Sequence, residues 1–368
     1  MQKNIITVAV TGLNAIDSPG PGLAVIRSLR AAKSFGVRVI GLSYEALEPA
    51  IYLEGVADKV YQIPYPSGGQ EVLLERFRYI CETEKIEMLF PNFDAELFNF
   101  IKLEPLLKSE LGIHMMLPTL EQFEARQKVS LYEYGAKHNL NVPMASMIFS
   151  PKEIPAFAEK NGYPIVVKGK FYDAKIAYNF EQASQGFNKI SAQWGLPIIL
   201  QKFIMGTEVN VCGLGDGTGK LMGAVPMRKL YITDKGKAWA GVSLDDENLL
   251  EITKRMVERT KWRGPFEMEF IKTTNEKSQT EEYHLLEINP RFPAWCYLTT
   301  GCGQNLVESA VNLTLGRPAK YFKKYKVGTM FIRYSNDLIV DMDDFETIST
   351  IGELEHKKSK KSSLIPSL

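Results

Sequence analysis

Cysteine and histidine are scarce in this sequence, and their spacing excludes the usual zinc motifs. The 368 residues include four cysteines, none in a CxxC pair, and four scattered histidines. Neither set has the spacing of a zinc site. So few and so scattered cysteines are typical of reduced thiols in a cytosolic protein.

Long hydrophobic runs are missing as well. No segment reaches the roughly 18 apolar residues of a membrane helix, and the N-terminal stretch MQKNIITVAVTG has too short an apolar run for a signal peptide. The formal net charge is only +1, which argues against a general nucleic-acid binder. We therefore expect a cytoplasmic protein with neither a membrane nor a nucleic acid as its partner.

A dinucleotide-binding fingerprint is also absent, although the first segment has the right context for one. Residues 1–117 alternate strand and helix patterns, which predicts an open parallel α/β domain. The first strand is followed by TGLNAIDSPGPG, which does not match GxGxxG. This loop, and Asn92 and Asp94 after the fourth strand, can line a substrate cleft or form ordinary turns. Both interpretations stay open.

The first domain ends at a break, GIHMMLPT, and from Val142 onward the sequence pattern changes. Thr119 and Gln122 have the spacing of a capping box and begin a helical segment. Strand patterns then surround a helix at 181–194, followed by a glycine-rich hairpin or meander and a helix at 245–261. We predict domains at 1–117, 118–200 and 201–350, and a disordered polar tail at 351–368 that includes HKKSKKSSLIPSL.

Two acidic strands carry the most informative pattern. In PFEMEFIKTT and EYHLLEINPR, acids alternate with apolar residues, and a polar turn between the strands indicates a hairpin. If the strands pair, Glu269, Glu287 and Asn289 converge. Two carboxylates and an amide oxygen suit a hard cation such as Mg²⁺, and Arg291 can bind a phosphoryl group. A half-solvated strand is the commoner explanation of one such pattern, but two strands followed by NPR favour a site.

Two further stretches are uninformative alone. YPIVVKGK places Lys168 at the end of a buried strand, where it can reach phosphates or simply face solvent. PIILQKFIMGTE fits a nucleotide hinge or an ordinary turn.

In combination, Lys168, QKFIMGTE and EMEF…LLEINPR resemble the ATP-grasp superfamily over roughly residues 118–325. The resemblance is strongest to its carbamoyl-phosphate-synthase-like and carboxylate–amine ligase branches. It implies a mixed α/β and α+β protein, with an ATP-grasp fold preceded by a parallel α/β pre-ATP-grasp domain.

The resemblance also implies roles for individual residues. Glu269, Glu287 and Asn289 would bind Mg²⁺, or Mn²⁺ in its place. Arg291 would contact the transferring phosphate or its acceptor, and Arg228 would face the γ-phosphate. The implied nucleotide-binding residues are Lys128, Lys168, Gln201, Lys202, Phe203, Ile204 and Glu208, with 201–204 at the adenine and Glu208 at the ribose.

Two positions depart from the family pattern. Lys168 is followed by GKFYDAKIAYNF, with Gly169 as its one glycine, where the family usually has a glycine-rich flap over the phosphates. Gln201 replaces an acid often found at the hinge, and its carbonyl can still accept from an adenine amino group.

The implied function is an ATP-dependent ligase that joins a small carboxylate to an amine through an acyl phosphate. No side-chain nucleophile is needed, and a homodimer is common among relatives. Two alternatives remain open: bicarbonate as the carboxylate, giving a carbamoylating or carboxylating enzyme, and a nucleotide-binding regulatory protein with weakened catalysis.

Overall fold

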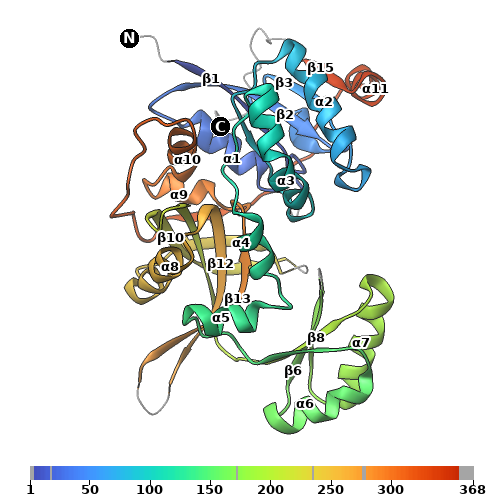
Figure 1. The fold of residues 1–368 in the computed structure, drawn as a ribbon, viewed down its shortest axis with the longest axis vertical. Helices are drawn as coiled ribbons and strands as arrows, with labels where there is room; N and C mark the ends of the chain where they lie inside the picture. The colour runs from blue at the N-terminus through green and yellow to red at the C-terminus, as the bar shows by residue number, and fades with distance from the viewer. Residues whose placement is uncertain (1–3, 17–18, 171–172, 234–235, 276–278, 356–368) are drawn as a thin grey trace.

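The described strands form three sheets, each of which makes up one body of the protein with its helices, and Figure 1 shows the six-stranded sheet between the five-stranded and the four-stranded one. The computed structural model describes residues 4–16, 19–170, 173–233, 236–275 and 279–355. None of the helices within these ranges is long and apolar enough to cross a bilayer.

The first sheet confirms the predicted α/β domain. Its strand order is β15-β3-β2-β1-β4, and β1 to β4 are parallel. The strands are β1 (Ile5–Val10), β2 (Gly36–Ser43), β3 (Lys59–Gln62) and β4 (Met88–Phe90). The helices are α1 (Gly22–Arg30), α2 (Gln70–Thr83) and α3 (Asp94–Leu111), with short 3₁₀ turns η1 (Pro49–Ile51) and η2 (Pro66–Gly68).

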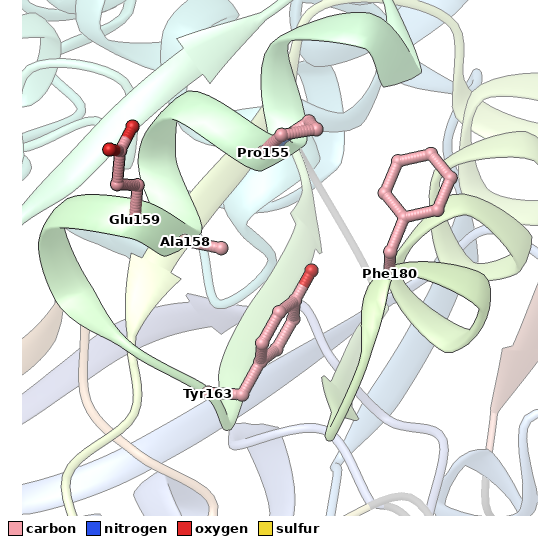
Figure 2. Close-up of a pocket in the computed structure, with 5 residues that line it drawn as sticks. All are labelled: Pro155, Ala158, Glu159, Tyr163 and Phe180. Atoms are coloured by element: carbon pink, nitrogen blue, oxygen red, sulfur yellow. The ribbon is translucent and has the colours of Figure 1, made fainter.

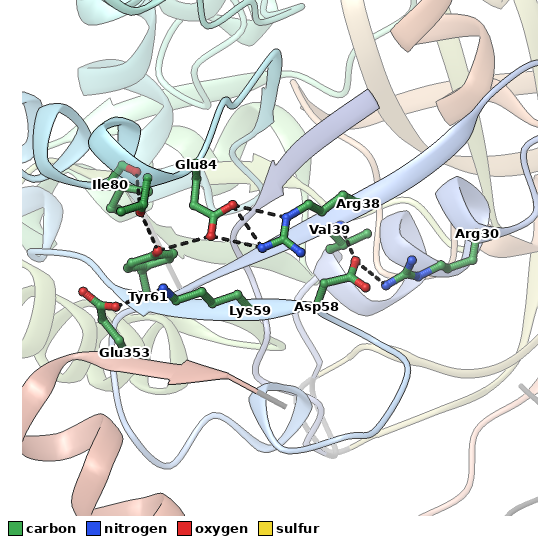
Figure 3. A network of polar contacts seen from close by, with 10 residues as sticks. Arg30, Arg38, Val39, Asp58, Lys59, Tyr61, Ile80, Glu84 and Glu353 are labelled. Carbon is green, nitrogen blue, oxygen red and sulfur yellow. Dashed lines mark hydrogen bonds and ion pairs between the residues drawn. The ribbon is translucent and has the colours of Figure 1, made fainter. Parts of the chain in front are cut away.

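The edge of this sheet corrects the predicted tail. Glu353–Glu355 form strand β15, which follows α11 (Met342–Ile351) and pairs antiparallel with β3. Figure 3 shows how the edge is held: Glu353 pairs with Lys59 at 3.2 Å, and the nearby Tyr61 hydroxyl donates to Glu84. A tail starting at 351 is therefore wrong for residues 351–355. HKKSKKSSLIPSL lies outside the described residues.

The second sheet is antiparallel, with the order β5-β8-β6-β7. It is approached through α4 (Leu120–Ala125) and α5 (Leu131–His138), and Thr119 and Gln122 make the predicted capping box. Its strands are β5 (Ala145–Ile148), β6 (Ile165–Gly169), β7 (Ala174–Ala177) and β8 (Ile198–Lys202). Because β8 runs to Lys202, this sheet extends past the predicted boundary at 200.

Helices α6 (Ile154–Asn161) and α7 (Phe180–Trp194) accompany this sheet, and η3 (Pro151–Glu153) leads into α6. Helix α7 was predicted, but α6 was not. Eight residues with only Ile154 and Phe157 buried give little periodicity to detect.

The third sheet has the order β13-β12-β9-β10-β11-β14 and confirms the predicted acidic hairpin. Its strands are β9 (Thr207–Asp216), β10 (Leu221–Ile232), β11 (Ala238–Ser243), β12 (Arg263–Thr274), β13 (Glu281–Asn289) and β14 (Met330–Ile332). Its helices are α8 (Glu247–Thr260), α9 (Tyr297–Gly301) and α10 (Leu306–Thr314).

The first and third bodies share one apolar core. Phe90 at the end of β4 meets Phe292 after β13, with ring centroids 6.1 Å apart. Helix α1 packs against α9 and α10, and Leu354 of β15 is buried in the same cluster. This shared core fixes the carboxyl edge of the first sheet against the chain that follows β13.

Removing the Leu354 side chain tests whether the C-terminal segment is part of this core. We expect Leu354→Ala to lower the free energy of unfolding by about 2–4 kcal/mol, because it leaves a cavity beside a buried sheet edge. Urea denaturation measures the change. Glu355→Ala, on an exposed neighbour in the same strand, is the control. Equal stability of both variants and the wild type would show that the edge strand contributes nothing.

Candidate active site

The register of β12 and β13 brings the predicted acidic residues together. Glu269 stands opposite Glu287, and Glu267 stands opposite Asn289. The Asn289 side-chain amide donates to Glu267 and to Glu269, both at 3.1 Å. The three predicted ligands Glu269, Glu287 and Asn289 therefore lie on one face of one hairpin.

Glu267 was not assigned a role from the sequence, yet it braces this group. It is almost fully buried, and its carboxylate also accepts from Asn210 Nδ2 at 2.9 Å and from Trp295 Nε1 at 2.6 Å. The sequence does place Glu267 on the same strand face as Glu269. Its hydrogen-bond donors Asn210 and Trp295, however, come from β9 and from the segment after β13, which a local pattern cannot reveal. These donors fix the position of the Glu267 carboxylate, and the Asn289 amide that donates to it is thereby held beside Glu269.

Lysine side chains neutralise part of this negative charge. Lys229 forms ion pairs with Glu208 and, at 3.7 Å, with Glu269, and Lys128 lies 3.5 Å from Glu287. Lys128 was predicted to lie near the phosphates and Glu208 near the ribose. The structure brings both to the acidic group.

Arg228 does not join this group, which corrects its predicted position. Arg228 pairs with Val209 and Val242 in the register of β10, and its side chain is exposed. Successive residues of a strand face opposite sides of the sheet. The face that carries Glu269 therefore receives Lys229, and Arg228 points away from it.

Lys168 lies on β6, in the neighbouring sheet, and faces the same charges. Burial lowers its pKa to about 8; Glu287 opposes this lowering and Lys128 adds to it. Burial and then the neighbouring Glu267 raise the pKa of Glu269, while Lys229 opposes that rise. A carboxylate that is difficult to ionise in the bare protein is ready to be stabilised by a cation.

These residues fit a divalent cation by donor type. Two opposed carboxylates and a neighbouring amide are the hard oxygen donors that Mg²⁺ and Mn²⁺ prefer. Across the described ranges, no group of three or more His, Cys, Asp and Glu side chains could hold a metal ion. A cation here would take its remaining ligands from waters and substrate phosphates, as Mg²⁺ usually does.

The predicted hinge, residues 201–204, comprises the last two residues of β8 and the two that follow. Gln201 is buried, and the Lys202 amide donates to the Met144 carbonyl at 2.8 Å. That amide is committed to the sheet, so any adenine contact from Lys202 must use its carbonyl. Beyond Ile204, Gly206 lies so close to β12 that an added Cβ would be 2.4 Å from the Lys272 carbonyl oxygen.

Arg291 projects from the end of β13 toward the first α/β domain. Its Nε and Nη2 donate to Oδ2 of Asp94, at 3.1 and 2.7 Å. Arg126, just after α4, is a second guanidinium that interacts with Asp94 and with Glu287. Sequence reasoning did not single out Arg126, because a helix-end arginine has no pattern of its own.

Two surface depressions differ in their relation to this group. One, of about 380 Å³, is formed by α6, Tyr163 and Phe180 on the second body and contains none of the predicted residues (Figure 2). The other, of about 360 Å³, is bordered by Glu208, Lys229 and the outer end of β10. Only the second adjoins the acidic group, so we assign the candidate site there.

Comparison with known proteins supports the motif-based prediction. A family model described as ATP-grasp in the biosynthetic pathway with Ter operon matches residues 196–335. The carbamoyl phosphate synthase large chain of Agathobacter rectalis is 24% identical over 281 residues, which cover 72% of this chain and 25% of that protein. The mitochondrial arginine-specific large chain of Neurospora crassa is 22% identical over 315 residues, which cover 79% and 25%. The chain thus spans about a quarter of the length of these relatives.

Solved structures share the fold at low sequence identity. Biotin carboxylase from Campylobacter jejuni, solved as a β,γ-ATP complex, has a TM-score of 0.66 and 16% identity, and covers 88% of this chain and 74% of its own. The ADP complex of N5-carboxyaminoimidazole ribonucleotide synthetase has a TM-score of 0.64 and 14% identity, and covers 89% and 81%. The biotin carboxylase domain of Hydrogenobacter thermophilus 2-oxoglutarate carboxylase, solved with MgADP, ADP and bicarbonate, has a TM-score of 0.65 and 18% identity, and covers 88% and 73%. The acidic hairpin, the lysine-bearing second sheet and these similarities together support the predicted resemblance to the ATP-grasp superfamily.

Proposed function

We propose that this protein is an ATP-dependent ligase that joins a small-molecule carboxylate to an amine and releases ADP and phosphate. The observation that carries the proposal is the register of the acidic hairpin, which sets Glu269 opposite Glu287 with Asn289 beside them and Arg291 at the strand end. Cytoplasmic location, a homodimer and the domain limits remain predictions.

The chemistry divides into two steps. A carboxylate oxygen of the substrate attacks the γ-phosphorus of ATP, so that the bond to ADP breaks and an acyl phosphate forms. The amine nitrogen then attacks the acyl carbon, phosphate leaves, and the nitrogen loses a proton to solvent. Neither step needs a covalent bond to the protein, so binding and charge stabilisation carry the catalysis.

The chain supplies groups for each part of the nucleotide. Glu269, Glu287 and Asn289 would hold Mg²⁺, which neutralises phosphate charge when bound. Lys168 and Lys128 would face the phosphates. Gln201–Ile204 would contact the adenine through main chain, and Glu208 would exchange its ion pair with Lys229 for the ribose hydroxyls.

Bicarbonate is a second candidate for the carboxylate. It is favoured by one observation, the shared fold with the Hydrogenobacter thermophilus domain whose structure contains bicarbonate. ADP release that depends on bicarbonate and needs no other carboxylate would select this alternative.

Mg²⁺-dependent ADP release should require both substrates. A screen of carboxylate and amine pairs, with mass spectrometry of the products, identifies them.

Glu287→Gln should reduce turnover at least about 100-fold, because it removes a metal-binding charge at the transferring phosphate. Glu282→Gln, at the far end of β13, is the matched control and should retain activity. Full activity of Glu287→Gln would contradict the metal assignment, and tight ATP binding without turnover in any mixture would favour the regulatory alternative.

Nucleotide binding should weaken as the pH rises through the Lys168 pKa. The protonated amine attracts phosphates, and its pKa of about 8 in the free protein lies below the usual lysine value. Bound phosphates hold the proton, so MgADP affinity should fall up to about tenfold between pH 7 and pH 9. Lys168→Arg should bind with little pH dependence over this range, since arginine stays charged. Calorimetric titration measures both. An identical pH profile in the arginine variant would rule Lys168 out as the titrating group.

A further inference from the structure

Helix α3 of the first α/β domain is joined to the third body at two places. Asp94, its first residue, pairs with Arg291 after β13. Glu104, further along the helix, forms an ion pair with Arg263, whose Nη1 donates at 3.0 Å at the start of β12. Both pairs connect the same two bodies through the same helix, but only the first reaches a residue of the proposed site.

The contacts of Arg291 define the plane of its guanidinium. Nε and Nη2 both donate to one oxygen of Asp94, and Nη1 donates to the Phe292 carbonyl at 3.3 Å. The adjacent Phe292 ring is anchored in the shared core against Phe90. A guanidinium fixed by a side chain and by its own neighbouring carbonyl can turn only if one of these contacts breaks.

The start of α3 is itself rigid. The Glu96 carboxylate accepts from the Phe93 amide at 2.9 Å and from the Thr11 hydroxyl at 2.5 Å. Tyr44 donates to the same carboxylate from the end of β2. Asp94 therefore projects from a helix terminus that is tied to the ends of β1, β2 and β4, and the helix dipole favours its ionised form.

Asp94 is surrounded by positive charge. Burial raises its pKa, but Arg291 and Arg126 outweigh burial and lower it, and Lys237 adds to the lowering. The second oxygen, Oδ1, is inaccessible to solvent and has no hydrogen-bond partner among the described residues; the same holds for Nε of Arg126. One carboxylate thus lies between two guanidiniums, and it binds Arg291 directly.

We propose that Asp94 is a positioning residue for Arg291: it holds the guanidinium in the orientation that receives the transferring phosphate, so that docking of the first domain completes the phosphate end of the site. This inference rests on the proposed function. It gives the α/β domain a role in phosphoryl transfer without contact between Asp94 and the nucleotide.

The test compares a diphosphate with a triphosphate. Affinities for MgADP and for Mg²⁺ with a non-hydrolysable ATP analogue are measured by calorimetry on the full chain. Asp94→Ala should weaken analogue binding about tenfold and MgADP binding less than about twofold, because only the γ-phosphate needs Arg291 in this orientation. Asp94→Asn keeps the shape of the side chain and one acceptor oxygen, so its affinity for the analogue should lie between those of the wild type and Asp94→Ala. It provides the same test if the alanine variant does not fold.

Glu104→Ala is the matched control. It removes an ion pair between the same helix and the same sheet, so a purely structural contribution would appear in both variants. We expect it to change the unfolding midpoint and to leave the ratio of the two affinities unchanged. In an Arg291→Lys background, Asp94→Ala should cause little further loss, since residues that act through one another are not additive.

The outcomes separate this inference from the proposed function. A wild-type protein that binds neither nucleotide rejects both. A wild-type preference for the triphosphate analogue that Asp94→Ala leaves intact, or equal losses for both nucleotides, rejects the positioning role alone. A full additional loss on top of Arg291→Lys rejects it as well.

Discussion

The pairing register of β12 and β13 is the constraint on which the candidate site depends. Side chains on a strand alternate between the two faces, so a slip of one residue would send Glu269 and Glu287 to opposite sides of the sheet. The hairpin keeps them opposed, and in the neighbouring pair Glu267 accepts hydrogen bonds from Asn289 opposite it and from Asn210 and Trp295. The hydrophobic faces of both strands enforce this register, because Met268, Phe270, Leu285 and Ile288 are buried in one core.

Burial disfavours the charged forms of the ionisable side chains on and around this hairpin. Desolvation opposes the ionisation of Glu269 and the protonation of Lys168, which lie in the same region. Burying charge is tolerated when opposite charges meet it, and the lysines and arginines around the hairpin do so in part. A site of this kind is suited to a polyanion with its cation, whose combined charges complement both sets.

The three bodies contribute unequally to this arrangement. The six-stranded sheet carries the acidic residues, the four-stranded sheet brings Lys168 over them, and the first domain reaches Arg291 through Asp94. The first and third bodies share a continuous apolar core, whereas Figure 1 shows the four-stranded sheet standing apart from it. The Arg291 end of the site therefore lies where the first and third bodies share a core, and the Lys168 end lies on the four-stranded sheet.

The sequence by itself determined the local elements and the order of the motif. Alternation in EMEF and LLEIN predicted the hairpin and its polar face, and the regular strand and helix patterns predicted the α/β domain, because both signals arise within a few residues of chain. The tertiary structure decided which charged neighbour of each pair faces the site. The pairing of β10 with β9 places Lys229, and not Arg228, on the face of the acidic residues. Asp94 and Arg126 lie near Arg291, and residues 353–355 pair with the first sheet. Those outcomes depend on contacts between segments far apart in the chain, and local sequence patterns do not predict such contacts.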